Sequence, residues 1–146
     1  MYRTILIPLD GSVLAEQALH ELPHIAAQNA VVYLVQVIRP TAPEITPEGV
    51  SAPSLSHALE ASQREALAYL KGAATELRMR GYQVRPEALV SEHPADAIAT
   101  FASARGVDLI IMSTHGLGGL SKLVFGSVTI QVIRQAPCPV LVVRPS

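Results

Sequence analysis

Several residue types are scarce in this 146-residue chain. It has one cysteine, Cys138, so an internal disulfide framework is excluded. Charged residues make up 16% of the sequence and the formal net charge is −1. This balance leaves no basic field that could hold a nucleic acid or an anionic membrane surface. No apolar run approaches the roughly 20 residues of a membrane-spanning helix. We therefore expect neither nucleic-acid nor membrane partners.

Apolar residues, in contrast, are abundant. They make up 49% of the chain, which excludes an intrinsically disordered protein. The length is typical of one domain and is sufficient for a substantial core. The first strand-like run begins at Arg3, which leaves no room for a signal peptide. We expect a cytoplasmic protein with a single domain over residues 1–146.

Five apolar runs have the character of β-strands, being rich in β-branched residues and bounded by glycine, proline or polar residues. The run 31–38 shows little alternation, which favours a strand covered on both faces. Pro86 cannot donate to a central ladder, so its strand is expected at an edge. The predicted strands are 3–9, 31–38, 82–90, 107–112 and 139–143.

Helical patterns separate these strands. Ser12 suits the N-cap of the first helix, Gly81 the C′ position after the second, and Pro94 the N1 position of the third. The segment 39–53 is proline-rich and is predicted to be a loop, either a lid or a disordered connection. The predicted helices are 12–26, 54–80, 94–104 and 127–135.

Strands that alternate with helices predict an α/β fold: a parallel sheet with right-handed crossovers and helices on both faces. The order that we expect for its five strands is 3-2-1-4-5. Ligands of such sheets bind beyond the carboxyl ends of the strands. Two segments at these ends carry glycine and polar residues, namely Asp10-Gly11-Ser12 and 113–127. We therefore expect the functional site there.

The second of these segments is rich in glycine. Gly116, Gly118 and Gly119 allow positive φ angles and a close approach of the backbone to a ligand. Gly126-Ser127 opens a helix, whose amides and dipole favour a phosphate. The alternative is a merely flexible connection. A Walker A string is absent, and the Rossmann-like glycine pattern that starts at Gly116 ends in serine and follows the fourth strand.

The loop resembles the nucleotide motif of the universal stress protein family: glycine, two residues, glycine, nine residues, then Gly-Ser or Gly-Thr. Gly116 and Gly126-Ser127 match it, and Ser113 replaces the first glycine. Three further segments carry the resemblance along the whole chain: Pro-Leu-Asp-Gly-Ser at 8–12, Asp-Leu-Ile-Ile-Met at 108–112, and the ending Ala-Pro-Cys-Pro-Val-Leu-Val-Val-Arg-Pro at 136–145.

The resemblance implies a Rossmann-like fold related to adenine nucleotide α-hydrolases, and a site for ATP or another adenine nucleotide together with magnesium. By position, Asp10 would contact the ribose and lie near the magnesium ion. The serine at 113 would either crowd the ligand or supply a further hydrogen bond. The residues implied for the base, the floor of the loop and the phosphates are Pro8, Leu9, Val37, Met112, Ser113, Gly116, Gly126, Ser127, Val128 and Thr129.

The last strand, Pro139–Val143, is expected at the other edge of the sheet. It is apolar and carries no inward charge, so it invites pairing unless a loop covers it. The family resemblance implies that two such strands pair across a two-fold axis to form a homodimer. Three functions remain open: a nucleotide-binding regulator with an unidentified protein partner, a slow ATPase, and a dimerisation module that binds no nucleotide.

Other patterns have simpler interpretations. The segment His20–His24 matches the zinc-protease string H-E-x-x-H, but Pro23 interrupts the helix that this chemistry needs. His115 and Asp10 could join a serine in a hydrolase triad, although no nucleophile motif accompanies them. Cys138 is expected to be a small buried residue, with a redox role as the alternative.

Overall fold

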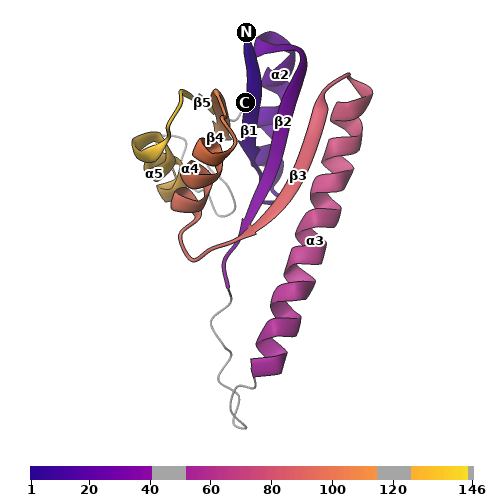
Figure 1. Ribbon diagram of the computed structural model, residues 1–146, viewed down its shortest axis with the longest axis vertical. Helices are drawn as coiled ribbons and strands as arrows, with labels where there is room; N and C mark the ends of the chain where they lie inside the picture. Colours follow the sequence, from indigo (N-terminus) through magenta and orange to yellow (C-terminus); the bar gives the residue numbers. More distant parts are fainter. Residues whose placement is uncertain (41–51, 115–125, 145–146) are drawn as a thin grey trace.

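The computed structural model describes residues 1–40, 52–114 and 126–144. Five strands form one parallel sheet of order β3-β2-β1-β4-β5, which confirms the predicted topology. The carboxyl ends of the strands lie together at one end of the sheet, because each connection carries the chain back to the end where the strands begin (Figure 1). Their bounds are β1 Tyr2–Pro8, β2 Ala26–Ile38, β3 Gln83–Val90, β4 Leu109–Ser113 and β5 Val140–Val143.

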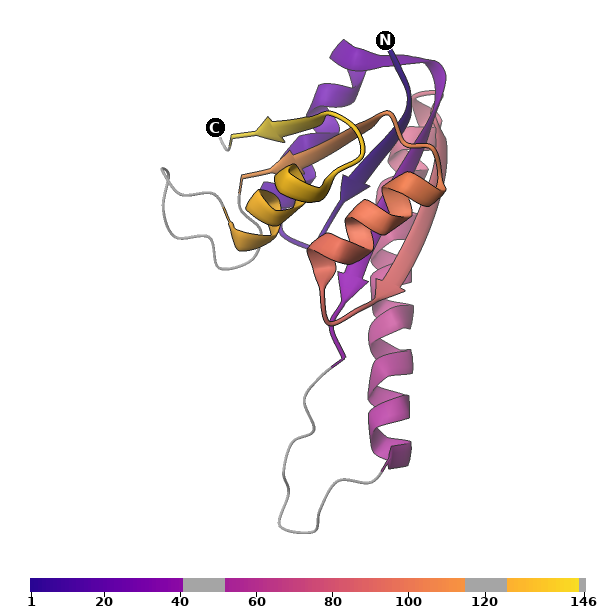
Figure 2. The same cartoon turned by 60° about the vertical axis from the view of Figure 1, so that its left-hand side comes forward.

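Helices cover both faces of the sheet, as expected. Figure 2 shows α4 and α5 on one face, whereas α3 and the short α1–α2 segment lie on the other. Two bounds match the prediction, α4 and α5. Pro53, expected in a loop, is instead the second residue of α3, where a missing amide breaks no intrahelical bond. The helices are α1 Val13–Glu16, η1 (a 3-10 helix) Gln17–Glu21, α2 Leu22–Ile25, α3 Ala52–Met79, α4 Pro94–Ala104 and α5 Ser127–Gln135.

The prediction of one continuous helix over 12–26 is wrong. The segment divides into α1, η1 and α2, because Pro23 has no amide with which to continue an α-helical ladder. The amide of Leu22 bonds to the carbonyl of Leu19, the i−3 pattern of a 3-10 turn. Ala26 already belongs to β2, which starts five residues before the predicted position and contains Asn29 at a φ of 59°.

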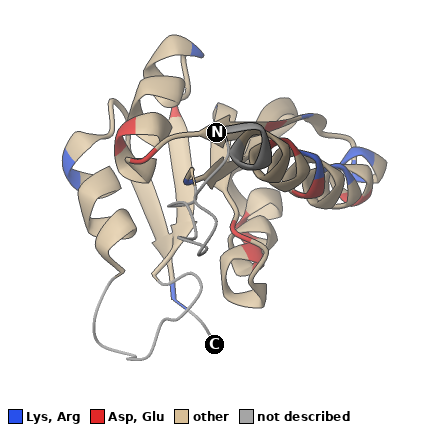
Figure 3. Ribbon diagram, turned by 90° about the horizontal axis from the view of Figure 1, so that it is seen from below, with Lys and Arg blue, Asp and Glu red and all other residues tan. Residues whose placement is uncertain are grey.

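The long helix α3 extends past the carboxyl ends of the strands (Figure 1). Residues of both charges lie along it, as Figure 3 shows. The following charged residues of the helix are exposed: Glu60, Arg64, Glu65, Lys71, Glu76 and Arg78. Gly81 ends the helix with a φ of 100°, in the predicted C′ role. In the three ranges of the chain described above, no helix is both long enough and apolar enough to cross a membrane.

Two apolar clusters hold the layers together. Alternate residues of the central strand face opposite sides: Ile5 and Ile7 pack toward α1 and α3, and Leu6 packs toward α4 and α5. All three are fully buried. β1 is therefore covered on both faces and hydrogen-bonded on both sides, to β2 and to β4.

A carboxylate joins β1 and β4 at their amino ends. Asp108, immediately before β4, accepts hydrogen bonds from the amides of Arg3 and Thr4, each at 3.0 Å. Its own amide donates to the Thr4 carbonyl at 2.8 Å. These three bonds fix the two strands relative to each other, and so determine which residues meet at the carboxyl edge.

The outer edge of β3 is poorly suited to pairing near Val84 and Pro86. Pro86 lies in this edge strand, as predicted, and has no amide hydrogen. The backbone groups of Val84, two residues earlier, point to the same side of the strand as those of Pro86. The Val84 carbonyl accepts a hydrogen bond from Arg78 Nη2 at 2.7 Å. Another strand would find neither a donor at Pro86 nor an unengaged acceptor at Val84.

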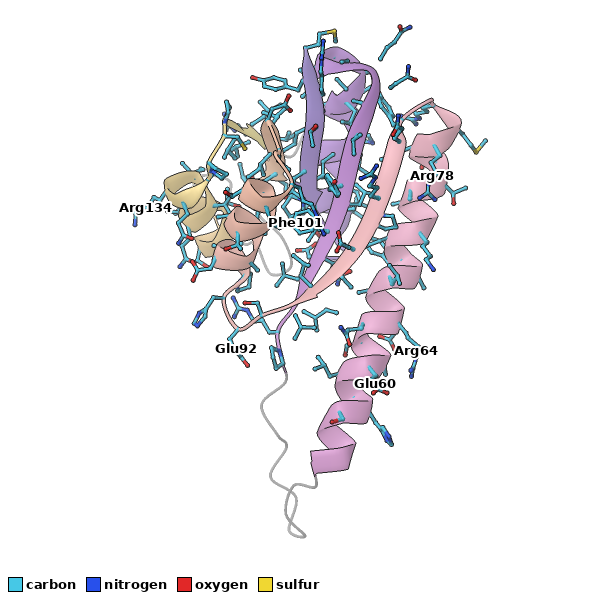
Figure 4. The ribbon with its side chains drawn as sticks, in the orientation of Figure 1. Glu60, Arg64, Arg78, Glu92, Phe101 and Arg134 are labelled. Carbon is cyan, nitrogen blue, oxygen red and sulfur yellow. The ribbon has the colours of Figure 1, made fainter. Side chains whose placement is uncertain are left out.

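We expect Asp108→Asn to lower the free energy of unfolding by about 1–2 kcal/mol, because an amide NH₂ would then face a backbone donor. Urea denaturation at pH 7 measures this loss. Glu92→Gln, which removes an exposed carboxylate outside the sheet contacts, is the control (Figure 4). Equal effects of the two substitutions would show that charge, and not the bonds to β1, accounts for the loss.

Candidate functional site

The turn after β1 presents a carboxylate at the carboxyl edge of the sheet. The amide of Leu9 donates to the Val35 carbonyl at 2.8 Å and extends the ladder past the end of β1. Asp10 Oδ1 then accepts the Ser12 amide at 2.9 Å, and Ser12 Oγ accepts the Ala15 amide at 3.1 Å. The second bond confirms Ser12 as an N-cap. Together they fix the Asp10 carboxylate where the strand ends.

The neighbouring strand β4 anchors the start of α5. Gly126 donates its amide to the Thr114 carbonyl at 2.8 Å, and Thr129 Oγ1 donates to the Ser113 carbonyl at 3.1 Å. Ser113 was expected at the base of the glycine loop. It is the buried last residue of β4, one residue beyond the predicted end of the strand, and pairs with Val143.

The amino end of α5 has the geometry of an anion site. Its first intrahelical bond runs from the Ile130 amide to the Gly126 carbonyl at 3.1 Å, so the amides of Ser127, Val128 and Thr129 lie outside the helical ladder. The helix dipole adds positive potential at this end. Ser127 is exposed, whereas Thr129 is buried and uses its hydroxyl to hold α5 against β4.

The remaining predicted residues fall on different faces. Val37 and Met112 belong to the apolar cluster on the α4–α5 side. Leu9 points into the opposite core and is 3% exposed, so only its backbone can border a ligand. Pro8 is partly buried at the end of β1. Gly116, the glycine predicted to approach the phosphates, lies outside the described residues.

Metal and hydrolase chemistry find no further support. In the described parts of the chain, no three His, Cys, Asp or Glu side chains come together as metal ligands. His20 and His24 lie in different helical segments, η1 and α2, and His24 Nδ1 is 3.8 Å from Glu21 Oε2. The zinc-protease string therefore lacks its continuous helix. His115, the proposed triad base, lies outside the described residues.

Comparison with known proteins identifies the family of this chain. A sequence model of the universal stress protein family matches residues 1–144. The chain belongs to the universal stress protein family. It is 36% identical over 145 residues to universal stress protein MJ0531 of Methanocaldococcus jannaschii, covering 99% of this chain and 83% of that protein. A Thermus aquaticus universal stress protein is 33% identical over 144 residues, covering 99% of this chain and all of the relative.

Solved structures show the same fold. The structure of MJ0577 superimposes with a TM-score of 0.85 at 33% identity, covering 100% of this chain and 98% of that one. Universal stress protein UspA of Lactobacillus plantarum gives a TM-score of 0.82 at 28% identity, with 98% of each chain covered. The resemblance stated from the sequence, and the Rossmann-like α/β fold it implies, are confirmed for this universal stress protein.

A second hydrogen-bonded contact, missed from the sequence, lies on the α3 side of the same turn. Tyr69 of α3 donates its hydroxyl hydrogen to Glu16 Oε1 of α1 at 2.8 Å. Burial is the largest cause that raises the pKa of Tyr69, followed by this bond and by the charges of Glu16 and Asp10. No role for Tyr69 was predicted from the sequence, because no local pattern pairs it with Glu16, 53 residues earlier.

Cys138 is half-buried, whereas a buried residue was expected. It packs at the border of the α4–α5 cluster, next to the start of β5. Burial raises the pKa of its thiol, and the charge of Asp108 raises it further. A raised thiol pKa lowers the fraction of reactive thiolate, which favours the apolar interpretation over the redox one.

We expect Tyr69→Phe to lower the free energy of unfolding by about 1–2 kcal/mol at pH 7, because Glu16 loses its donor. The raised pKa of Tyr69 means that its contribution is complete below the ordinary tyrosine pKa of about 10 and is lost as the pH rises above it. Urea denaturation at pH 7 and pH 11 should show the difference between parent and variant shrinking. Tyr82→Phe, a partly buried tyrosine at the amino end of β3, is the control. A difference that does not change with pH would contradict this role.

Proposed function

We propose that this universal stress protein binds an adenine nucleotide, ATP in the first instance, at the carboxyl ends of β1 and β4. The observation that carries the proposal is the anchored amino end of α5. Two bonds hold it beside the last residues of β4, at the sheet edge that also presents Asp10. A helix start of this kind binds phosphate through its first amides and its dipole.

Each predicted residue has a chemical part in this proposal. The amides of Ser127 and Val128 bind phosphate oxygens, and the Asp10 carboxylate accepts ribose hydroxyls. Backbone near Pro8, Leu9 and Val37 borders the adenine, and the buried Met112 lies with Ser113 where the glycine loop starts. Magnesium, when bound, neutralises phosphate charge. Among the predicted site residues only Asp10 offers a carboxylate, so the phosphates and water would supply the other magnesium ligands.

One further comparison supports the class of ligand. A universal stress protein that is 22% identical, with a TM-score of 0.70, has been crystallised in complex with cAMP. That complex shows that this fold can hold an adenine nucleotide. Ser113 replaces a motif glycine in our chain. Its side chain is buried within β4, and its carbonyl is engaged by Thr129.

We propose that the nucleotide regulates and is not turned over. Asp10 is the only predicted site residue with a side chain that could act as a general base near neutral pH, and one of its oxygens already accepts the Ser12 amide. Occupancy would instead alter the surface at the strand ends, which an unidentified protein partner would recognise. We place this activity in the cytoplasm, with residues 1–146 forming one domain.

Gly126→Asp should abolish the contribution that the phosphates make to the affinity for ATP. Aspartate is a favourable N-cap, so the helix should persist while its carboxylate occupies the phosphate position and repels the ligand. We expect ATP affinity, measured by calorimetry with magnesium, to fall at least about tenfold. Gly126→Asn, which has the same shape without the charge, is the matched control and should bind much more tightly than the aspartate variant.

Equal affinities in the aspartate and asparagine variants would place the phosphates elsewhere. Absence of binding in the parent chain would contradict the proposal. Recovery of binding in Ser113→Gly would then identify the serine as the cause, and would leave a dimerisation module as the function. Hydrolysis of ATP at a rate that depends on Asp10 would instead support the slow ATPase.

We further propose a homodimer formed through β5. β5 is the last strand of the sheet and pairs only with β4 among the described strands. The carbonyls of Pro139 and Val143 accept hydrogen bonds from the amides of Ile110 and Thr114, each at 3.0 Å. Because backbone groups alternate in direction along a strand, the amides of Val140 and Val142 point to the outer edge. These outward groups can pair with a second copy.

Val142→Pro should dissociate such a dimer without opening the sheet, because it removes an outward amide and leaves the bonds to β4 intact. Sedimentation velocity should show a shift from dimer to monomer. Val142→Thr keeps the amide and a β-branched side chain, and should remain dimeric. A proline variant that is still dimeric would place the interface away from β5.

A further inference from the structure

A hollow of about 350 Å³ lies on the α3 side of the Asp10 turn. The ends of β1 and β2 contribute Gly11, Gln36 and Ile38, and α3 contributes Ser62, Glu65 and Tyr69. Its volume is within the range of small-molecule sites. Gln36 alternates with Val37, so the hollow opens on the face of the sheet opposite the one to which the Val37 side chain points.

One buried acceptor in this hollow has no partner. Gln36 Oε1 has less than 1 Å² of accessible surface and accepts no hydrogen bond within the described structure. Leaving such an oxygen unpaired costs about 1–3 kcal/mol. The Gln36 side chain lines the hollow, and the terminal torsion of glutamine is soft, so a ligand could reach this oxygen only after the amide rotates. A ligand with a hydrogen-bond donor would satisfy it.

Among the other polar side chains around the hollow, the Ser62 hydroxyl can donate or accept, whereas Tyr69 and Glu65 can only accept. Tyr69 has already given its hydroxyl hydrogen to Glu16, so only its lone pairs remain. Glu65 is exposed and forms no ion pair within the described part of the chain. Neither lysine, arginine nor histidine lines the hollow, and Arg64 projects from α3 on the side away from the strands in Figure 4.

The charged side chains around the hollow are negative, which also favours a positively charged ligand. The charges of Glu16 and Asp10 both act on the Tyr69 hydroxyl, so negative potential reaches the wall of the hollow from the turn as well as from Glu65 at its mouth. An anion would be repelled here. A neutral ligand would satisfy the acceptors but not the charge.

We propose that this hollow binds a small organic cation, whose ammonium group donates to Gln36 Oε1 and pairs with the Glu65 carboxylate. The site is distinct from the nucleotide site and does not depend on it. An ammonium supplies three donors on one positive charge, which matches the acceptors and the sign of the potential. The hollow is open to solvent, so we expect affinity in the millimolar range.

Putrescine and 1,4-butanediol are suitable probes, because they have equal chain length and differ in charge. We would titrate the full-length ¹⁵N-labelled protein without nucleotide and follow the Gly11 amide and the Gln36 side-chain amide. Putrescine should shift both signals saturably, and butanediol should bind at least about tenfold more weakly. Glu65→Gln should weaken putrescine about threefold, and Gln36→Leu should weaken it further.

Glu60→Gln is the matched control, since it removes the same charge from an exposed position of α3 that does not line the hollow (Figure 4). Equal losses in the Glu60 and Glu65 variants would overturn the proposal in favour of diffuse attraction. So would unshifted signals at high putrescine concentration, or equal binding of butanediol. A blocked lysine, N-acetyl-lysine methylamide, carries the same ammonium on a peptide. If this probe binds more tightly than putrescine, the proposal that the ligand is a free small cation is overturned.

Discussion

Strand β1 is bonded to a parallel neighbour on both sides, and its central residues are buried against both layers of helices. Its position therefore determines the positions of the elements around it. Asp108 fixes its start against β4, and the Leu9 amide continues its ladder with β2 beyond Pro8. Parallel pairing then brings the ends of β1, β2 and β4 to one edge. Polar residues that are distant in the sequence therefore lie at this end of the sheet, although no sequence pattern links them to one another.

The turn after β1 serves two sides of the sheet. It carries the Asp10 carboxylate at the carboxyl end of β1, and the neighbouring strand β4 holds the start of α5 through Thr129. Toward α3 it borders a hollow whose polar side chains can accept hydrogen bonds. The Ser12 cap and the Tyr69–Glu16 bond join the turn to α1 and α3, so the position of the carboxylate depends on both helices. Negative charge in this turn therefore has opposite effects on the two proposed ligands, since it attracts a cation and must be offset for a polyphosphate.

The edge position of Pro86 and the bounds of α4 and α5 were predicted correctly, because these depend on local patterns of period 3.6 and on proline. The expected strand order is also confirmed, although no local pattern determines it. Prediction from the sequence failed at residues 12–26, where Pro23 outweighed the apolar periodicity, and at Ser113, which continues a ladder that polarity alone suggested had ended. The partners of Asp108 and Tyr69 could not be predicted, since each lies across the fold. Gln36 was visible as a polar residue in an apolar run, but only packing shows that its oxygen is unpaired.

The two edges of the sheet are not equivalent. Along β3, Pro86 has no amide hydrogen and the Val84 carbonyl is engaged by Arg78, whereas β5 carries outward amides at Val140 and Val142. Strand pairing is therefore favoured at β5 and disfavoured at β3. If two copies associate through β5, that edge is occupied in both of them. The guanidinium of Arg78 and the ring of Pro86 would then oppose the addition of further copies at the other edge, so that association through strands would favour a closed pair over an extended sheet.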